Sequence, residues 1–240
     1  MSNTVIILTH HPDPHAEVVR EEVARRGVPL CCLDQADFPP RVTLCGELFT
    51  NGDGWSGTLA FQDQLVAFDD IISIWRRRPQ PWQAPASYSS GLKTFAEREA
   101  AQAFLGLLES LEDKLPGALL VSRPDALRRA ERKALQLHTA HRLGLCVPRT
   151  LLTNDPAAVR AFYEECQGGV IVKPVAKGII DDEPQHCFYT SRVTAEHLRD
   201  LERVRLSAHL FQEEISKALE IRIVVIGQHV FAAEIYSQQS

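Results

Sequence analysis

The amino-acid sequence predicts an α/β protein whose N-terminal part contains a parallel sheet. Residues 5–9 form a short β-branched run, residues 15–26 carry apolar side chains at helical spacing, and residues 28–33 form a second apolar run. A strand, a helix and a strand in such quick succession are typical of a βαβ unit, in which both strands belong to one parallel sheet. Gly27 follows the helical run at a position where glycine commonly ends a helix.

The rest of the first half combines short strands with one long helix. Residues 41–74 interleave apolar positions with turn signals such as Asn51-Gly52-Asp53-Gly54, which predicts short strands and hairpins. Residues 94–113 repeat apolar side chains three or four positions apart, so we expect a helix with one apolar side. Pro116-Gly117 closes this helix, and residues 118–121 are expected to form another strand.

The second half alternates helices and strands in a different order. A helix is expected from Pro124-Asp125 to Leu143, and another after the cap Asn154-Asp155, with a proline in its first turn. A third helix is expected from Thr194. The predicted strands are one that ends at Thr153 and residues 170–174, 208–211 and 220–226, with residues 230–236 pairing back as a hairpin.

The composition argues against some partners. The net charge is −5 with 26 basic residues, whereas general nucleic-acid binding needs a basic surplus. No stretch approaches the ~20 apolar residues of a membrane span, and the N-terminus lacks the features of a signal peptide. We therefore expect no membrane partner and a cytoplasmic location. The six cysteines lack zinc-site spacing, and the turn around His10, His11 and His15 favours surface histidines over a metal site.

Two lysines are candidates for chemistry. Lys133 stands in a basic helical stretch, where a solvated helix face is the simple alternative. Lys173 ends the apolar run 170–173 and precedes a proline. A lysine there is costly to bury unless it meets an anion, and the alternative is that its chain extends outward at the strand end.

Three charged segments are further candidates. Gln212-Glu213-Glu214-Ile215 lies between two apolar strands, where its carboxylates could grip a ribose or a metal, or form a solvated connector. Glu220 and Arg222 are two apart on a predicted strand and point to one face. An arginine held there by a carboxylate could meet a phosphate or a carboxylate, and a surface ion pair is the alternative. Trp75-Arg76-Arg77-Arg78-Pro79 fits either a peptide-binding patch or a domain-interface plug.

The order of these segments resembles the ATP-grasp fold. The resemblance implies a pre-ATP-grasp α/β domain over residues 1–122 and an incomplete ATP-grasp nucleotide-binding domain over residues 123–240. It implies that Lys133 and Lys173 touch the phosphates of ATP and that the loop around Lys177 and Gly178 forms a lid over them. The remaining implied nucleotide-binding residues are Gln212, Glu213, Glu214, Ile215 and Glu220, with the hinge at 213–215 reading adenine and holding ribose. Arg222 is the implied catalytic residue, facing the phosphate or the acyl acceptor.

Other segments resemble the microviridin-type (graspetide) ATP-grasp peptide maturases. They are residues 7–10, 13–16, 33–34, 37–39, 75–79, 143–145, 147–150 and 153–156. The resemblance implies a ligase that uses ATP and Mg²⁺ to phosphorylate Asp or Glu side chains of a ribosomally made precursor peptide with leader and core parts. A Ser/Thr hydroxyl or Lys amine then displaces the phosphate, which gives an ester or amide ring. Related enzymes suggest a homodimer, for which the sequence has no interface signature.

The resemblance also leaves points open. Asp181 and Asp182 could contact a basic residue of the leader, or belong to a solvated acidic loop. The family's magnesium ligands lie further on, and no Glu-x-Asn follows Arg222, so we assign no metal ligand and expect a truncated enzyme or a fragment. Two other functions are a non-catalytic partner that binds ATP or a leader peptide, and an ATP-grasp ligase that acts on a small amino-acid substrate.

Overall fold

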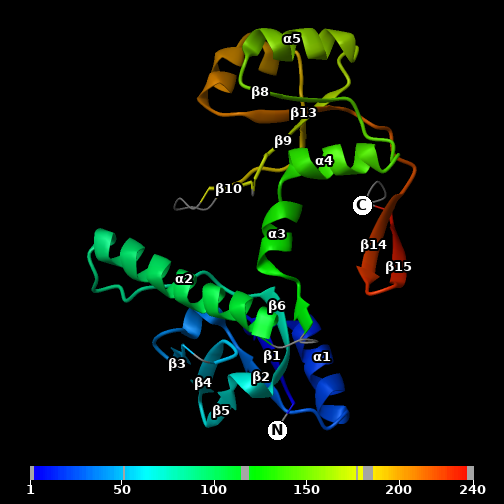
Figure 1. The fold of residues 1–240 in the computed structure, drawn as a ribbon. Helices are drawn as coiled ribbons and strands as arrows, with labels where there is room; N and C mark the ends of the chain where they lie inside the picture. The colour runs from blue at the N-terminus through cyan, green and yellow to red at the C-terminus, as the bar shows by residue number, and fades with distance from the viewer. Residues whose placement is uncertain (1–2, 51, 115–118, 177, 181–185, 237–240) are drawn as a thin grey trace. The chain divides into compact units, whose positions relative to one another are not determined.

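The computed structural model describes residues 3–50, 52–114, 119–176, 178–180 and 186–236. The protein is a mixed α/β structure, as Figure 1 shows. Its chain divides into two compact units, Met1–Arg128 and Arg129–Ser240, and the boundary lies within helix α3 (Pro124–Ala130). None of the described helices is both long enough and apolar enough to cross a membrane.

The first unit contains a parallel sheet with the strand order β2-β1-β6-β7. These strands are β1 (Thr4–Thr9), β2 (Leu30–Leu33), β6 (Ile71–Arg78) and β7 (Leu119–Val121). Helix α1 (Pro14–Arg25) connects β1 to β2, so the predicted βαβ unit is confirmed. The helix begins where it does because the Asp13 carboxylate accepts hydrogen bonds from the backbone N–H groups of His15 and Ala16.

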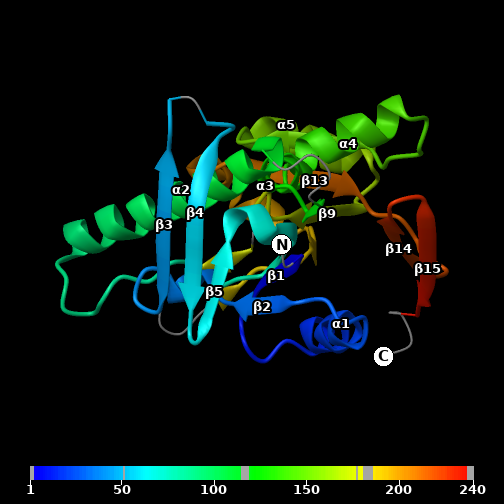
Figure 2. The ribbon, with the colours of Figure 1, turned by 60° about the horizontal axis from the view of Figure 1, so that its bottom comes forward.

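An antiparallel meander and a long helix complete the first unit. The meander consists of β3 (Val42–Leu48), β4 (Trp55–Phe61) and β5 (Gln64–Ala67), and Leu48 pairs with Trp55 on either side of the predicted turn. Short 3₁₀ turns occupy η1 (Gln35–Asp37) and η2 (Phe68–Asp70). Helix α2 (Ser90–Lys114) runs beside the meander in Figures 1 and 2, and Phe104 and Leu111 on it join Ile6 and Leu59 in one core.

The second unit contains an antiparallel sheet with the strand order β12-β9-β13-β8. These strands are β8 (Thr150–Thr153), β9 (Val170–Lys173), β12 (Ser191–Arg192) and β13 (His209–Glu213). Helix α5 (Pro156–Glu165), capped by Asp155, packs Val159 and Phe162 against Val170 and Phe211. One face of the sheet is therefore filled by this core.

Two of the expected helices are wrong in detail. The helix expected from residue 124 to Leu143 is broken, because Arg132 is extended and separates α3 from α4 (Lys133–Arg142). The helix expected from Thr194 is replaced by the 3₁₀ turns η3 (His197–Arg199) and η4 (Leu201–Leu206). The Thr194 N–H and hydroxyl bond instead with His197 Nδ1.

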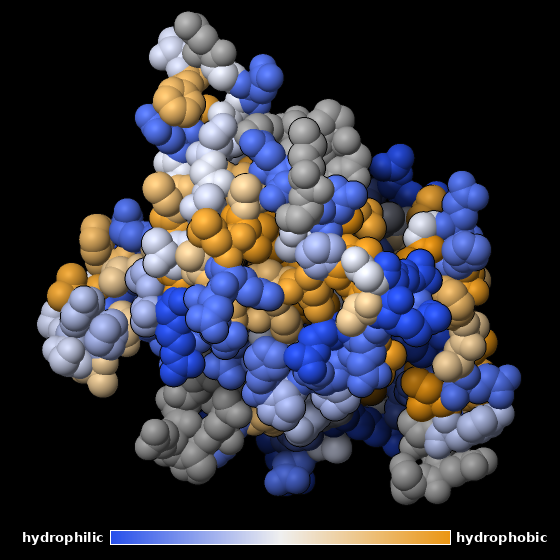
Figure 3. All heavy atoms as spheres, turned by 90° about the horizontal axis from the view of Figure 1, so that it is seen from below, coloured by the Kyte–Doolittle hydropathy of each residue, from blue (hydrophilic) through white to orange (hydrophobic). Residues whose placement is uncertain are grey.

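Two small hairpins remain. Strands β10 (Ile179–Ile180) and β11 (His186–Cys187) form one, and β14 (Glu220–Ile226) and β15 (His229–Ile235) form the other, as predicted. Ile223 and Val224 point to opposite faces of β14, yet they are 60% and 45% exposed. Exposed hydrophobic residues also occur elsewhere, and Figure 3 shows them among hydrophilic ones on one face of the molecule.

Candidate functional site

The candidate site lies on the face of the second sheet opposite α5. Because side chains alternate along a strand, Val170 and Val172 enter the core while Ile171 and Lys173 point to the other face. Gln212 pairs with Ile171 in the register of β9 and β13 and so shares that face. It is 4% exposed, and its amide donates a 2.9 Å hydrogen bond to Thr150 Oγ1. The sheet thus holds Gln212 in one fixed position.

Lys133 and Lys173 come together at the end of β9. Lys133 is the first residue of α4, and its Nζ donates to the carbonyl oxygens of Val175 and Ala176 at 3.2 and 3.0 Å. Burial lowers the pKa of Lys173 below its usual range, and the positive charges of Lys217 and Lys133 lower it further. Lys133 thus contacts the loop that directly follows Lys173.

Lys217 was not assigned to the site from the sequence. It ends the run that starts at Gln212, and its Nζ forms an ion pair with Glu220 Oε1. Its charge acts on Lys173, which lies far away in the sequence. The available signal was only its place at the end of an acidic run, and no spacing rule links that position to Lys173.

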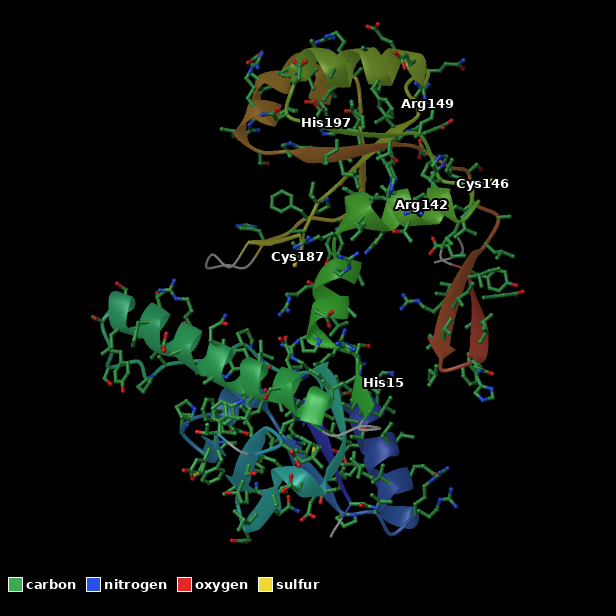
Figure 4. All side chains as sticks on the ribbon, viewed as in Figure 1. His15, Arg142, Cys146, Arg149, Cys187 and His197 are labelled. Atoms are coloured by element: carbon green, nitrogen blue, oxygen red, sulfur yellow. The ribbon has the colours of Figure 1, made fainter. Side chains whose placement is uncertain are left out.

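The hinge segment lines a pocket of about 600 Å³. The backbone N–H groups of Glu213 and Glu214 donate to the carbonyl oxygens of Arg149 and Gly169 at 3.0 and 2.9 Å, which fixes the path of the segment. Figure 4 labels Arg149 where the chain enters β8. Ile215 is 53% exposed, and no described group accepts a hydrogen bond from its N–H. The pocket is lined by Ile171, Thr190, Arg192, Glu214, Ile215, Ser216 and Lys217.

Arg192 is a second lining residue that the sequence did not indicate. It lies on β12, and its Nε is 2.9 Å from Glu214 Oε2. Both side chains are partly exposed, so the pair contributes little to stability. The pairing of β12 with β9 brings Arg192 here, since Arg192 lies opposite Ile171.

The loop after β9 passes very close to β11. The Phe188 N–H donates to the Gly178 carbonyl oxygen at 2.6 Å, and a Cβ on Gly178 would lie 2.2 Å from the Phe188 oxygen. Only glycine fits this approach, which lies beside a second pocket of about 500 Å³ that Lys173 also lines. Lys177, Asp181 and Asp182 lie outside the described residues, so their predicted roles stay predictions. Cys187, labelled in Figure 4, marks the β11 strand of this hairpin.

Glu220 and Arg222 do not form an ion pair with each other among the described residues. Glu220 pairs with Lys217, whereas Arg222 is exposed and forms no ion pair among the described residues. Arg222 lies opposite Ala233 in the β14–β15 hairpin. The contacts therefore connect Glu220 to Lys217, and the role of Arg222 stays a prediction.

The charges of the site suit a polyanion such as a nucleotide triphosphate. Lysines gathered at a strand end would each gain a charge-assisted hydrogen bond from phosphate oxygens, and their mutual repulsion would be offset. The described residues contain no group of three or more His, Cys, Asp or Glu side chains that could hold a metal ion.

Comparisons with known proteins identify the fold and the family. Residues 4–117 match the MvdD pre-ATP grasp domain. The chain is similar to macrocyclase MdnC from Microcystis aeruginosa MRC, crystallised with precursor peptide MdnA, at 30% identity and a TM-score of 0.87, over 98% of this chain and 76% of that one. Macrocyclase MdnB from the same organism matches at 30% identity and a TM-score of 0.81, over 99% and 76% of the chains.

A third solved relative carries a nucleotide. The RiPP-associated ATP-grasp ligase of Chryseobacterium gregarium, in complex with ADP and a leader and core peptide, matches at 26% identity and a TM-score of 0.88. That match covers 99% of this chain and 70% of the relative. No match was found among curated proteins.

The fold and the site define an α/β protein with a pre-ATP-grasp domain followed by a partial ATP-grasp region. The chain belongs to the microviridin-type (graspetide) ATP-grasp family. Both expectations drawn from the sequence, on fold class and on family, are confirmed.

Proposed function

We propose that the chain is an ATP-dependent ligase that activates Asp or Glu side chains of a ribosomally made precursor peptide as acyl phosphates and forms ester or amide macrocycles. The observation that carries the proposal is the contact of Lys133 with the loop after β9, directly beyond Lys173. Two of the similar structures support it, because one holds a precursor peptide and another holds ADP with a leader and core peptide.

The proposed roles follow from where each group lies. Lys133 and Lys173 would bind the phosphates, since both end near the loop that follows β9. The hinge at residues 213–215 would read adenine through its backbone, because the Ile215 N–H is not bonded to a described group. The same hinge would hold the ribose, and Gln212 would set its position through its bond to Thr150. Glu220 would be a further nucleotide-binding residue.

The proposed reaction has two steps. A carboxylate oxygen of the peptide attacks the γ-phosphorus of ATP, the bond to the ADP oxygen breaks, and an acyl phosphate forms. A hydroxyl or amine of the same peptide then attacks the acyl carbon and loses its proton, and phosphate leaves. The lysines would stabilise the charge on the transferred phosphoryl group, and Arg222 would face the phosphate or the acyl acceptor.

Other parts of the chain have proposed roles as well. Residues 1–122 would form the pre-ATP-grasp domain and residues 123–240 the nucleotide-binding domain. Asp181 and Asp182 would contact a basic residue of the leader. Mg²⁺ neutralises phosphate charge in reactions of this type. A homodimer is proposed from the related enzymes alone.

The test is a calorimetric titration of ATP with magnesium into the 240-residue chain and its Lys173→Ala variant. We expect the parent to bind and the variant to bind at least about tenfold more weakly, since one charge-assisted hydrogen bond is lost. Absence of binding by the parent would overturn the proposal for this chain. Phosphate release that depends on an acidic peptide supports a ligase, whereas nucleotide binding without release under those conditions favours the non-catalytic partner.

A further inference from the structure

The first unit contains a pocket of about 280 Å³ that shares no lining residue with the two pockets of the second unit. Three segments form its wall: the chain after η1, the segment that joins β6 to α2, and the first part of α2 (Figure 1). Most of the lining residues are aromatic, proline or alanine. A pocket of this size suits a small ligand with an apolar surface.

Two aromatic rings of the pocket are fixed by the core of the first unit. Phe38 and Trp82 both pack against Phe104 of α2, which is 1% exposed. The ring centroids are 5.4 Å apart for Phe38 and Phe104, and 6.3 Å apart for Trp82 and Phe104. Tyr88 adds a third ring and is 40% exposed. Two of the three rings are therefore held in place without a ligand.

The indole N–H of Trp82 has no hydrogen-bond acceptor among the described residues, although Nε1 is buried. Buried donors without a partner are uncommon in folded proteins, and each one destabilises the folded chain. Contact with Phe104 holds the ring instead. The described chain makes no use of the indole nitrogen, so the large π surface is what distinguishes Trp82 from a phenylalanine at this position.

Glu97 supplies the charge of the pocket. The other described lining residues include no Asp, Lys, Arg or His. Glu97 is half-buried, and its Oε1 accepts a 3.0 Å hydrogen bond from the Ala84 N–H, which fixes the carboxylate. It forms no ion pair with a described residue. A carboxylate without a counter-ion beside apolar side chains attracts a cation and disfavours a phosphate.

We propose that this pocket binds a small alkylated ammonium ion. The face of an aromatic ring attracts a cation, and tryptophan does so most strongly among the aromatic residues. Glu97 balances the charge, and the apolar lining contacts the alkyl groups. A metal ion is a poorer match, because one carboxylate offers too few oxygen ligands. The inference goes beyond the proposed function, since it uses none of the residues assigned there to ATP or to the precursor peptide.

The test is a ligand-observed NMR titration of the full chain with choline and with the neutral alcohol in which carbon replaces the choline nitrogen. We expect choline to bind at least about tenfold more tightly, because only choline carries a charge for the rings and Glu97. Glu97→Gln should weaken choline binding about tenfold, while its side-chain oxygen can still accept from the Ala84 N–H. Glu99→Gln makes the same charge change on the exposed side of α2, outside the pocket, and should bind choline as the parent does.

Two further variants test the contribution of the indole ring. Trp82→Phe should weaken choline binding, and Trp82→Leu should weaken it more. Trp82→Phe loses no hydrogen bond to a described group, so its melting temperature should stay close to that of the parent.

The outcomes that contradict the inference are distinct from those that contradict the proposed function. Equal affinity of the parent for choline and the alcohol, or no binding of choline, would overturn the inference. Unchanged choline affinity in Glu97→Gln would overturn it as well. Failure of the parent to bind ATP, with Glu97-dependent choline binding kept, would contradict the proposed function alone.

Discussion

Gly178→Ala is expected to open the β10–β11 hairpin at its base. The added Cβ would lie 2.2 Å from the Phe188 oxygen and 2.7 Å from Pro174 Cγ. Both distances are far below van der Waals contact, and one of the atoms belongs to the backbone, so the two chain segments must separate. That movement also breaks the 2.6 Å hydrogen bond from the Phe188 N–H to the Gly178 carbonyl oxygen.

The change in the free energy of unfolding caused by Gly178→Ala is the sum of opposing contributions. Overpacking costs about 1–3 kcal/mol, and loss of the hydrogen bond adds about 0.5–1.5 kcal/mol. Replacing glycine by alanine stabilises the folded chain by about 0.4–1 kcal/mol, because alanine restricts the unfolded chain. We therefore expect a net destabilisation of about 1–3 kcal/mol, concentrated in the segment around Gly178 and Phe188. Because Lys173 lies a few residues before Gly178, ATP affinity should fall as well.

The assay is hydrogen–deuterium exchange on the free chain, read for peptides that cover residues 170–192 and for the rest of the sheet. Gly106→Ala is the matched control, because Gly106 lies on the exposed side of α2 and its Cβ would meet no atom within 4 Å. That change should stabilise the first unit by about 0.5–1 kcal/mol. Unchanged protection of the Phe188 amide in Gly178→Ala would refute the reasoning from close approach.

Further predictions concern charge. Lys173→Met should weaken ATP binding by about tenfold or more. It should also raise the stability of the free chain in urea denaturation, because the buried charge and its repulsion with Lys217 and Lys133 disappear. ATP affinity should fall as pH rises through the lowered pKa of Lys173, and calorimetry should show proton uptake on binding. Lys217→Ala should move that fall to higher pH, because it removes a positive charge that lowers the pKa of Lys173. In the free chain, the unfolded state holds the lysine proton to higher pH, so stability should rise between the lowered pKa and 10.5. Asp13→Ala should lower the free energy of unfolding by about 1–3 kcal/mol, because it removes a helix cap and leaves Arg77 without its carboxylate. Since the pKa of Asp13 is lowered in the folded chain, the stability that it contributes should be lost as pH falls below about 4.

The sequence predicted the elements whose signals are local. The βαβ unit, the long helix and the C-terminal hairpin each rest on a period or a cap that a short window contains. The helix from residue 124 to Leu143 was wrong because its break has no proline or glycine, and Arg132 is extended without a side-chain cap. The break makes Lys133 the first residue of α4, from which Nζ contacts two carbonyl oxygens after β9. This contact joins residues far apart in the sequence, so helical periodicity could not predict it.

The candidate site shows the same division. Lys173 could be found from the sequence because a lysine at the end of an apolar strand is conspicuous. Gln212 could be found because it begins a polar run between two apolar strands. Lys217 and Arg192 could not, since each looks like an ordinary surface charge until strand pairing brings it to the pocket. For Arg192 the missing information is the order of the strands in the sheet. That order places β12 beside β9, although the β10–β11 hairpin lies between them in the sequence.

The arginines at the end of β6 show how much a single register shift changes. Strict alternation along the strand would place Arg76 and Arg78 on one face and Arg77 on the other. A β-bulge breaks that alternation, because Thr9 follows Leu8 directly on β1 while their partners Arg76 and Arg78 are two apart. Arg77 can then reach Asp13, the residue that also caps α1. A feature invisible in the sequence pattern thereby couples the start of a helix to the charge at the sheet edge, and a mutation that removed the bulge should separate Arg77 from Asp13 without changing a single charge.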